Sequence, residues 1–405
     1  MRATTLAYVA DDGTLTLRPI DEHGVDEPVG IASGSDREQL VGPIWSPAGA
    51  LAVSRTGRDA EKALTGEFQL HTTQQRSGRL LFRNPPNAPN VMAPGVAHYA
   101  AWSHDGRRVA LVAPGAEQLQ LYLLEPSLAD PEVPPRPLLG GAPMFLAWSP
   151  DDRLLAIHRG NDLLLIDAAA VEAGAEPDEA RQPLISDVPT YRAPGWTVDG
   201  ASIIYAAPRA QAGNALWTVR RDGSDRSAIA DLDDVTALSR APARDLLALV
   251  TLSPAVAAGH DLRLLDLQAE TIDPIEAGPV TAAFWAPDGS ALYYFVPSSE
   301  DGEYALQRWR LADRSRQWLT RFRPSAHFMT LLSFYDQYAH SHHLLSPDGR
   351  WLTLGGIVPS NGAGGRLGFA TQPGCYILPA DGSGPPQRIA AAEIGFFSPV
   401  PGLLG

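Results

Sequence analysis

One short phrase returns along almost the whole chain: a Trp followed by Ser-Pro-Asp-Gly or a close variant, and then by a short apolar stretch. The copies that keep the Trp begin at 45, 102, 148, 196 and 285, and degenerate copies begin at 240, 345 and 397. The steps between these positions run from 44 to 60 residues, which is close to the length of a four-stranded propeller blade, as in WD40-type repeats. The repeat therefore predicts an all-β chain folded as a β-propeller.

Each unit is expected to hold four short strands, and residues 280–320 illustrate the pattern. Strands are expected at 280–285, 291–296, 305–311 and 317–320, because these runs are rich in β-formers and are separated by turn residues. Asp-Gly pairs suit the tight turns, since Gly tolerates a positive φ and Asp partly does. The Trp side chains are expected to fill the gaps between neighbouring sheets, with each indole N–H on a carbonyl. We assign these Asp and Trp residues to folding rather than to catalysis.

The two ends of the chain complement each other. Residues 5–17 look like the second and third strands of a blade that lacks a first strand, and residues 393–399 look like a first strand with nothing after it. Together they would complete one blade and close the ring, which removes exposed sheet edges. The sequence thus predicts a single propeller domain over residues 1–405, with eight four-stranded blades, or seven if the degenerate copy at Arg240 or the last copy is misread.

The Trp-Ser-Pro-Asp-Gly phrase with its following apolar strand resembles the propeller repeat of TolB, which also occurs in propellers of the prolyl oligopeptidase group. The resemblance covers essentially the whole chain, and it implies a fold rather than an activity. The peptidases carry a Gly-x-Ser-x-Gly nucleophile elbow, which this sequence lacks, and TolB has an added N-terminal domain, whereas this chain enters its first strand within a few residues. The resemblance therefore implies the ring of blades without the attached activity.

Charge and cysteine content limit the partners and cofactors. The formal net charge of −14, without a basic cluster, argues against nucleic acid or an anionic membrane surface as the main partner. Cys375 is the only cysteine, so neither an intramolecular disulfide nor a multi-thiolate metal site can form. The sequence shows neither a leader nor an apolar run that could span a bilayer. We expect a cytoplasmic protein, or an extracytoplasmic one if a leader has been removed.

Long connections are expected to gather on one rim of the ring, at 55–66, 84–97, 321–340 and 358–374, and long loops on a rigid scaffold are where binding usually resides. The segment 321–343 is the most unusual of these regions, since it combines aromatic residues with four of the ten histidines. A first interpretation is a short amphipathic element that plugs the channel or caps the rim. A second is a protein-docking surface, with the anchors Arg323, Phe328, Phe334, Tyr335 and Tyr338.

A third interpretation of segment 321–343 is a metal site. His340 and His342 would share one face of a strand, and Asp336 or His327 would complete the ligand set, since imidazole and carboxylate suit zinc, iron or nickel. The Gly-rich stretch 360–368 is expected to be a loop. It is not expected to bind phosphate, because such a site needs the N-terminus of a following helix and the next residues are expected to form a strand.

The functional prediction is a non-catalytic interaction or assembly module without a cofactor, which presents this loop-rich rim to a protein partner. The alternative is a small-molecule or metal-binding propeller, with lyase or hydrolase activity at the channel mouth and a divalent metal on His327, Asp336, His340 and His342.

Overall fold

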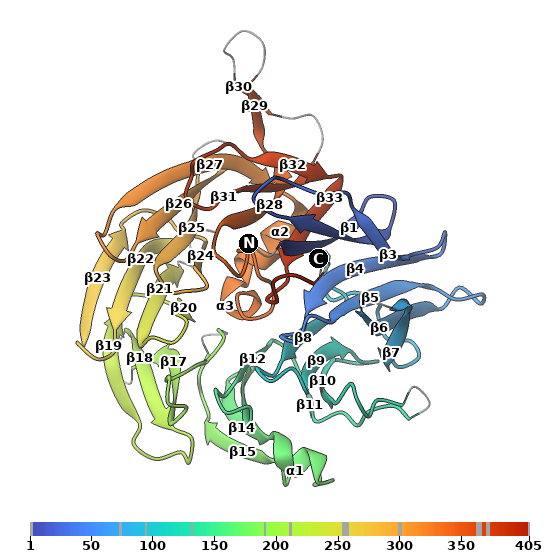
Figure 1. Ribbon diagram of the computed structural model, residues 1–405. Coiled ribbons are helices and arrows are strands. Elements are labelled where there is room, and N and C mark those ends of the chain that lie inside the picture. The colour runs from blue at the N-terminus through green and yellow to red at the C-terminus, as the bar shows by residue number, and fades with distance from the viewer. Residues whose placement is uncertain are drawn as a thin grey trace.

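The computed structural model describes residues 3–72, 75–93, 95–130, 133–189, 192–209, 213–252, 259–298, 302–361, 367–369 and 373–403. In this part of the chain, antiparallel sheets are arranged around a centre that holds the helices α2 (Ala326–Ser333) and α3 (Tyr335–Tyr338) (Figure 1). The all-β architecture predicted from the repeat is present.

Five sheets of four strands follow one another along the described chain, each built from consecutive strands. The first contains β4 (Glu38–Trp45), β5 (Leu51–Arg58), β6 (Leu64–Thr72) and β7 (Gln75–Arg83). The second contains β8 (Tyr99–Trp102), β9 (Val109–Pro114), β10 (Leu119–Leu124) and β11 (Leu139–Gly140). The third contains β12 (Met144–Trp148), β13 (Leu154–Arg159), β14 (Asp162–Asp167) and β15 (Arg181–Ile185), with α1 (Ala168–Glu172) after β14.

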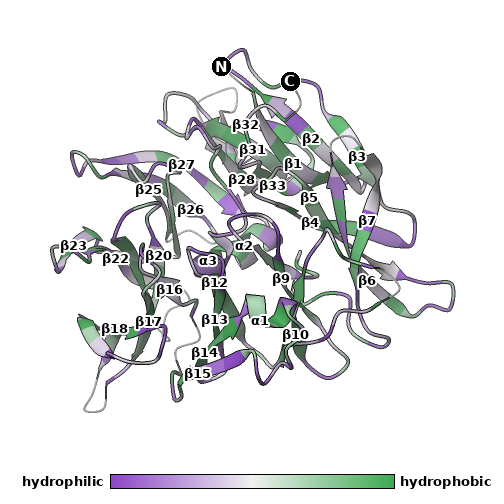
Figure 2. Ribbon diagram, turned by 60° about the horizontal axis from the view of Figure 1, so that its bottom comes forward, coloured by the Kyte–Doolittle hydropathy of each residue, from purple (hydrophilic) through white to green (hydrophobic). Residues whose placement is uncertain are grey.

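The fourth of these sheets contains β16 (Gly195–Trp196), β17 (Ser202–Pro208), β18 (Asn214–Arg220) and β19 (Ser227–Leu232). The fifth contains β20 (Thr236–Arg240), β21 (Leu246–Leu252), β22 (Gly259–Asp266) and β23 (Thr271–Glu276). Burial decreases from the middle strands to the last strand of a sheet: β14 is mostly buried, whereas β15 is half-buried or exposed. Figure 2 shows the same gradient, with hydrophobic colour on β13 and β14 and hydrophilic colour on β15.

One further four-stranded sheet joins the two ends of the chain. It has the order β3 (Val29–Ser33), β2 (Thr14–Ile20), β1 (Thr4–Ala10), β33 (Ala392–Phe397). In the β1–β33 pair, Leu6 lies opposite Phe397 and Ala7 opposite Phe396. Strands from the first and last parts of the sequence thus share one sheet, with β33 at the edge position where the sequence analysis expected a first strand.

The remaining large sheet is less regular than the repeat predicts. It runs β24 (Ala282–Trp285), β25 (Ala291–Pro297), β26 (Tyr304–Arg310), β27 (Arg316–Pro324), β28 (Trp351–Ile357), β31 (Gly374–Pro379), β32 (Gln387–Ala390). The strand expected at 317–320 is longer because the end of β27 continues onto β28, where Pro324 pairs with Gly356. A Cβ at Gly356, whose φ is +140°, would lie 2.0 Å from the Arg323 carbonyl oxygen, so this close approach requires glycine.

The repeat copy at 345 lacks the expected first strand within the described residues. An isolated bridge between Leu345 and Leu352 stands in its place. The chain before Leu345 comes directly from the helix α3 and does not form a strand. Instead of a plain loop, the connection 358–374 contains a hairpin of β29 (Pro359–Asn361) and β30 (Leu367–Phe369), which projects beyond the ring in Figure 1. Residues 362–366 and 370–372 of this connection lie outside the described residues.

The repeated Trp residues tie neighbouring sheets together, as the sequence analysis expected. Four of the five indole Nε1–H groups donate to a backbone carbonyl of the edge strand in the adjacent sheet, at 2.9 to 3.0 Å; the pairs are Trp45 with Phe396, Trp148 with Ala101, Trp196 with Ala147, and Trp285 with Ser239. These bonds satisfy the polar atom of a large, mostly buried side chain. The exception among the described residues is Trp102, whose buried Nε1 has no hydrogen-bond partner.

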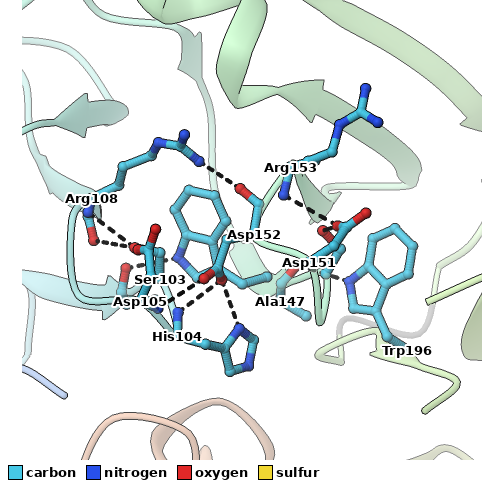
Figure 3. Close-up of polar contacts among 12 residues, drawn as sticks. Ser103, His104, Asp105, Arg108, Ala147, Asp151, Asp152, Arg153 and Trp196 are labelled. Atoms are coloured by element: carbon cyan, nitrogen blue, oxygen red, sulfur yellow. Dashed lines mark hydrogen bonds and ion pairs between the residues drawn. The ribbon is translucent and has the colours of Figure 1, made fainter. Parts of the chain in front are cut away.

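The Asp residues of the repeat stabilise its turns (Figure 3). The Asp151 carboxylate accepts a hydrogen bond from the Ser149 hydroxyl at 2.6 Å and one from the Arg153 backbone N–H at 3.2 Å. Ser103 and Asp105 form the same contact at 2.6 Å in the turn of the preceding sheet. The folding role assigned to these aspartates agrees with this geometry, because local bonds of this kind define Asx-type turns.

Asp152 adds a clamp between two successive turns. It stands where most copies have Gly, with a φ of 55°, and it accepts bonds from the His104 backbone N–H at 2.8 Å, the His104 Nδ1 at 2.7 Å and the Asp105 N–H at 2.8 Å (Figure 3). Burial alone would raise the pKa of Asp152, but the hydrogen bonds from His104 and Asp105 leave that pKa below its ordinary value. Among the described residues, no helix is long and apolar enough to cross a membrane.

Candidate functional site

The segment after β27 folds into the centre around which the sheets are arranged, which agrees with the first interpretation of the sequence. Ser325 caps α2 by accepting the Phe328 N–H at 3.2 Å. The apolar face of α2 is buried, and the Phe328 ring contacts Phe295 and Phe322 at centroid distances of 5.6 and 5.7 Å. This burial makes α2 part of the core rather than of the surface.

The helix α3 is hydrogen-bonded to the surrounding sheets. The Tyr99 hydroxyl donates to the Gln337 carbonyl at 3.2 Å, and the Gln337 side-chain oxygen accepts the Leu146 N–H at 3.0 Å. The Tyr335 hydroxyl donates to the Ala237 carbonyl at 3.3 Å. We call α2 and α3 together the plug, because the burial of α2 and the hydrogen bonds of α3 hold both helices at the centre around which the sheets are arranged (Figure 1).

Most of the expected docking anchors do not form a surface. Phe328, Tyr335 and Tyr338 are 0%, 1% and 7% exposed, and a buried ring cannot contact a partner without unfolding the plug. The Arg323 guanidinium lies 3.1 Å from the Glu303 carboxylate. Phe334 alone of the five is an exposed aromatic, at 42%, and its ring centroid lies 6.3 Å from that of Phe145.

The expected metal ligands do not converge. Asp336 is buried and accepts the Ala193 N–H at 2.9 Å, with the Arg192 guanidinium at 3.5 Å, so it anchors the plug. The His327 ring packs beside Phe396, while His342 Nδ1 lies 2.8 Å from the Ser341 hydroxyl. Among the described residues, no group of three or more His, Cys, Asp or Glu side chains could hold a metal ion. His327, Asp336, His340 and His342 therefore form no ligand cluster in this structure, and a metal on them stays a prediction.

A cavity of about 690 Å³ lies at the centre of the sheets, next to the chain that leaves α3. We call it the cup. Its walls are the ends of the first strands and their turns, including Trp45, Trp102, Trp148, Trp196 and Trp285. Its floor is the chain that leaves α3, residues 339–345. The opening lies on the rim with the repeat turns, since Pro47, Pro242, Pro287 and Pro347 line it, and not on the rim of long loops.

The basic side chains that line the cup are one arginine and four histidines. Arg240, His104, His340, His342 and His343 line it, and none of its described lining residues is acidic, although the whole chain carries a formal charge of −14. A second cavity of about 560 Å³ on the opposite rim shows the contrast, because Asp11, Asp12, Asp36, Glu38 and Glu393 are among its lining residues. The cup is thus the less negative of the two cavities.

Desolvation keeps three imidazoles of the cup, those of His340, His342 and His343, neutral near neutral pH. It lowers the pKa of His340 to about 4, and the charge of Arg240 adds to this effect. Burial also lowers the pKa of His343 to about 4. Arg240 is the only Arg, Lys, Asp or Glu side chain among the described lining residues.

Arg240 and His104 were not singled out from the sequence as functional residues. A signal for Arg240 exists, since it stands where the other copies have Trp, Leu or Phe, and this departure was interpreted as decay of the repeat. His104 replaces the Pro of the phrase, and its Nδ1 is bonded to Asp152.

No protein-family model matches the chain, and no curated protein matches its sequence. Among solved structures, a eukaryotic initiation factor has a TM-score of 0.55 at 12% identity, with 99% of each chain covered. An oligogalacturonate lyase in complex with manganese has a TM-score of 0.51 at 15% identity, covering 86% of this chain and 85% of that one. TolB from Acinetobacter baumannii has a TM-score of 0.41 at 14% identity, covering 76% and 77%. At identities this low, a structural match shows a similar fold and does not show a shared activity. The chain has a β-propeller fold, as its repeat predicts.

Proposed function

We propose that this chain is a non-catalytic binding module and that its ligand enters the cup. The observation that carries this proposal is a cavity of about 690 Å³ with five Trp residues and a single Arg side chain in its lining. Ligand sites are commonly cavities of about 300 to 1,000 Å³ with apolar and aromatic walls and a few convergent polar groups. The cup has both properties, and it is held open by strands that are bonded to one another.

The proposed architecture is a closed ring of eight blades. Support comes from the repeat positions, from the β1–β33 pair and from the Trp45 indole, which reaches Phe396 from the next sheet. The blade that begins near Leu345 would be the irregular one, with β28, β31 and β32 as its strands. A closed ring explains why one continuous cup can form, since the first strand of each sheet would contribute to the same wall.

The second proposal is a protein partner that binds the loop-rich rim. Its specific support is the exposed ring of Phe334 between the two helices of the plug, because exposed aromatic residues are frequent anchors at interfaces. Replacing Phe334 by Ala should weaken capture of such a partner and should leave binding in the cup unchanged. A cytoplasmic location also stays a prediction.

The proposal for the cup is tested by ligand-observed NMR with a mixture of small aromatic acids, amides and amines. We expect saturation transfer to some members of the mixture in the natural protein. In the variant His340→Trp, an indole would occupy the cup from its floor, since the His340 side chain already faces that space, and the signals should disappear.

The matched control is Val198→Trp, on a repeat turn but outside the cup, where the side chain is 37% exposed. This variant adds the same indole and should keep the signals. No transfer to any compound in the natural protein, or equal transfer in both variants, would contradict binding in the cup.

A further inference from the structure

We propose that the cup selects a monocarboxylate with an aromatic or apolar body, and that Arg240 binds its carboxylate. This inference rests on the proposed function, because it names the ligand class of the same cavity. It follows from the place of Arg240 in the wall, the lack of a partner for its guanidinium and the chemistry of the groups around it.

Arg240 takes the place of an indole in the wall of the cup. It ends β20 as Trp148 ends β12 and Trp285 ends β24. The strand position is the same, since Trp285 of the next sheet donates to the carbonyl of Ser239, the residue before Arg240, at 3.0 Å. A repeat that uses a large apolar side chain at this position thus carries a cation once, and that cation lines the cavity.

The Arg240 guanidinium forms no hydrogen bond or ion pair with another described residue, although the side chain is half-buried. Asp245 acts on it only through space. Two other partly buried arginines differ in this respect, because they have carboxylate partners: Arg192 lies 3.5 Å from Asp336, and Arg263 lies 2.6 Å from Asp261. Since burying a charge without a partner is unfavourable, a ligand anion would supply the missing contact.

The surroundings favour one negative charge rather than two. Because burial keeps His340 and His343 neutral near neutral pH and the described lining holds no second Arg or Lys, a phosphate dianion would bring a second charge without a second guanidinium or ammonium group to balance it. A carboxylate instead matches the paired N–H groups of a guanidinium. A neutral imidazole of His340, which faces the cup, can donate one further hydrogen bond.

The walls define the rest of the ligand. Indoles, together with Phe284 and Leu146, give the cup an apolar lining around the Arg240 guanidinium, which favours a flat or apolar body over a sugar-like one. The same chemistry could come from a free small acid or from the C-terminal carboxylate of a partner chain that ends in an aromatic residue. The experiment separates these two sources.

The test is isothermal titration calorimetry with two matched pairs of probes. The first pair is 3-phenylpropionate and 3-phenylpropionamide, and the second is a short peptide that ends in Phe, with a free or an amidated C-terminus. We expect the acid of at least one pair to bind at least about tenfold more tightly than its amide, as one charge-assisted contact would allow. Tighter binding of the free acid points to a small-molecule ligand, and tighter binding of the peptide points to a chain terminus.

In the variant Arg240→Met, the preference for the acid should be lost. Arg244→Met is the matched control, because Arg244 lies in the same turn, is exposed and is not among the residues that line the cup, so the preference should persist. If Arg240→Met does not fold, Arg240→Trp restores the residue of the other repeats and gives the same comparison.

Equal affinity for acid and amide in the natural protein would overturn this inference and leave binding in the cup intact. A preference for the acid that survives both Arg240 variants would overturn the role of Arg240. The absence of binding by every probe, the amides included, would overturn the inference and the proposed function together.

Discussion

The Trp45 indole connects the first half of the chain to its last strand, and its removal tests that connection. Trp45 ends β4 and is 2% exposed, and its Nε1–H donates to the Phe396 carbonyl in β33 at 2.9 Å. Truncating a buried Trp to Ala costs about 3 to 5 kcal/mol. Because Trp45 borders the cup, water can enter the space that is left, so we expect the lower end, about 3 kcal/mol.

A second variant separates packing from hydrogen bonding. Trp45→Phe keeps an aromatic ring but removes the N–H donor, which leaves the Phe396 carbonyl without this bond. The expected loss is about 1 to 2 kcal/mol, since a typical net hydrogen bond is worth about 1 kcal/mol and an unsatisfied group costs more. The difference between the two variants then measures the apolar contact.

The assay is urea unfolding followed by far-ultraviolet circular dichroism, with the slope of the transition checked for each variant. Trp318→Ala is the control, because this indole on β27 is 60% exposed and surface substitutions usually change stability by less than about 0.5 kcal/mol. If Trp45→Ala unfolds like Trp318→Ala, the indole does not join the two sheets and the inter-sheet role of the repeat Trp residues is refuted.

Two further predictions concern a buried imidazole and the clamp between turns. The His98 imidazole lies 2.8 Å from both Ser54 and Asn84, and burial lowers its pKa to about 3. In the unfolded chain the same imidazole is protonated near its ordinary pKa of about 6.5. The free energy of unfolding should therefore fall as the pH drops from about 6.5 towards 3, by up to about 1.4 kcal/mol per pH unit. Urea midpoints across this range should depend less on pH in His98→Gln, and identical profiles would contradict the assignment. Asp152→Gly restores the usual repeat residue and relieves a positive φ, yet we expect a loss of about 1 to 2 kcal/mol because three hydrogen bonds from the preceding turn are removed. A variant as stable as the natural protein in thermal melts would show that the clamp contributes nothing.

The parts of the fold that could be predicted are those that a local pattern determines. Each copy of the phrase sets a turn through its Asp and an inter-sheet contact through its Trp, so strands such as β24 and β25 fall within two residues of their expected bounds. The irregular sheet could not be predicted, because β27 reaches β28 only where Gly356 lets the Arg323 carbonyl approach. That contact depends on the paths of two segments and not on any periodicity.

The site was harder to predict than the fold for a related reason. The aromatic residues of segment 321–343 suggested docking anchors, but residue type does not tell whether a helix lies on a ring or inside it. Once α2 and α3 occupy the channel, Phe328 and Tyr335 become core residues. Arg240 is the reverse case. Its departure from the repeat was interpreted as decay, but the structure places it in the lining of a cavity with five indoles, where the proposed binding site needs a charged group.

The position of the plug has a kinetic consequence. In the proposed closed ring, a ligand bound beside Arg240 would leave through the opening by which it entered, because α3 is bonded to strands of several sheets on the other side. Such a propeller would retain a ligand rather than conduct one, and a bulky extension of that ligand would lie outside the cup, on the face formed by the repeat turns.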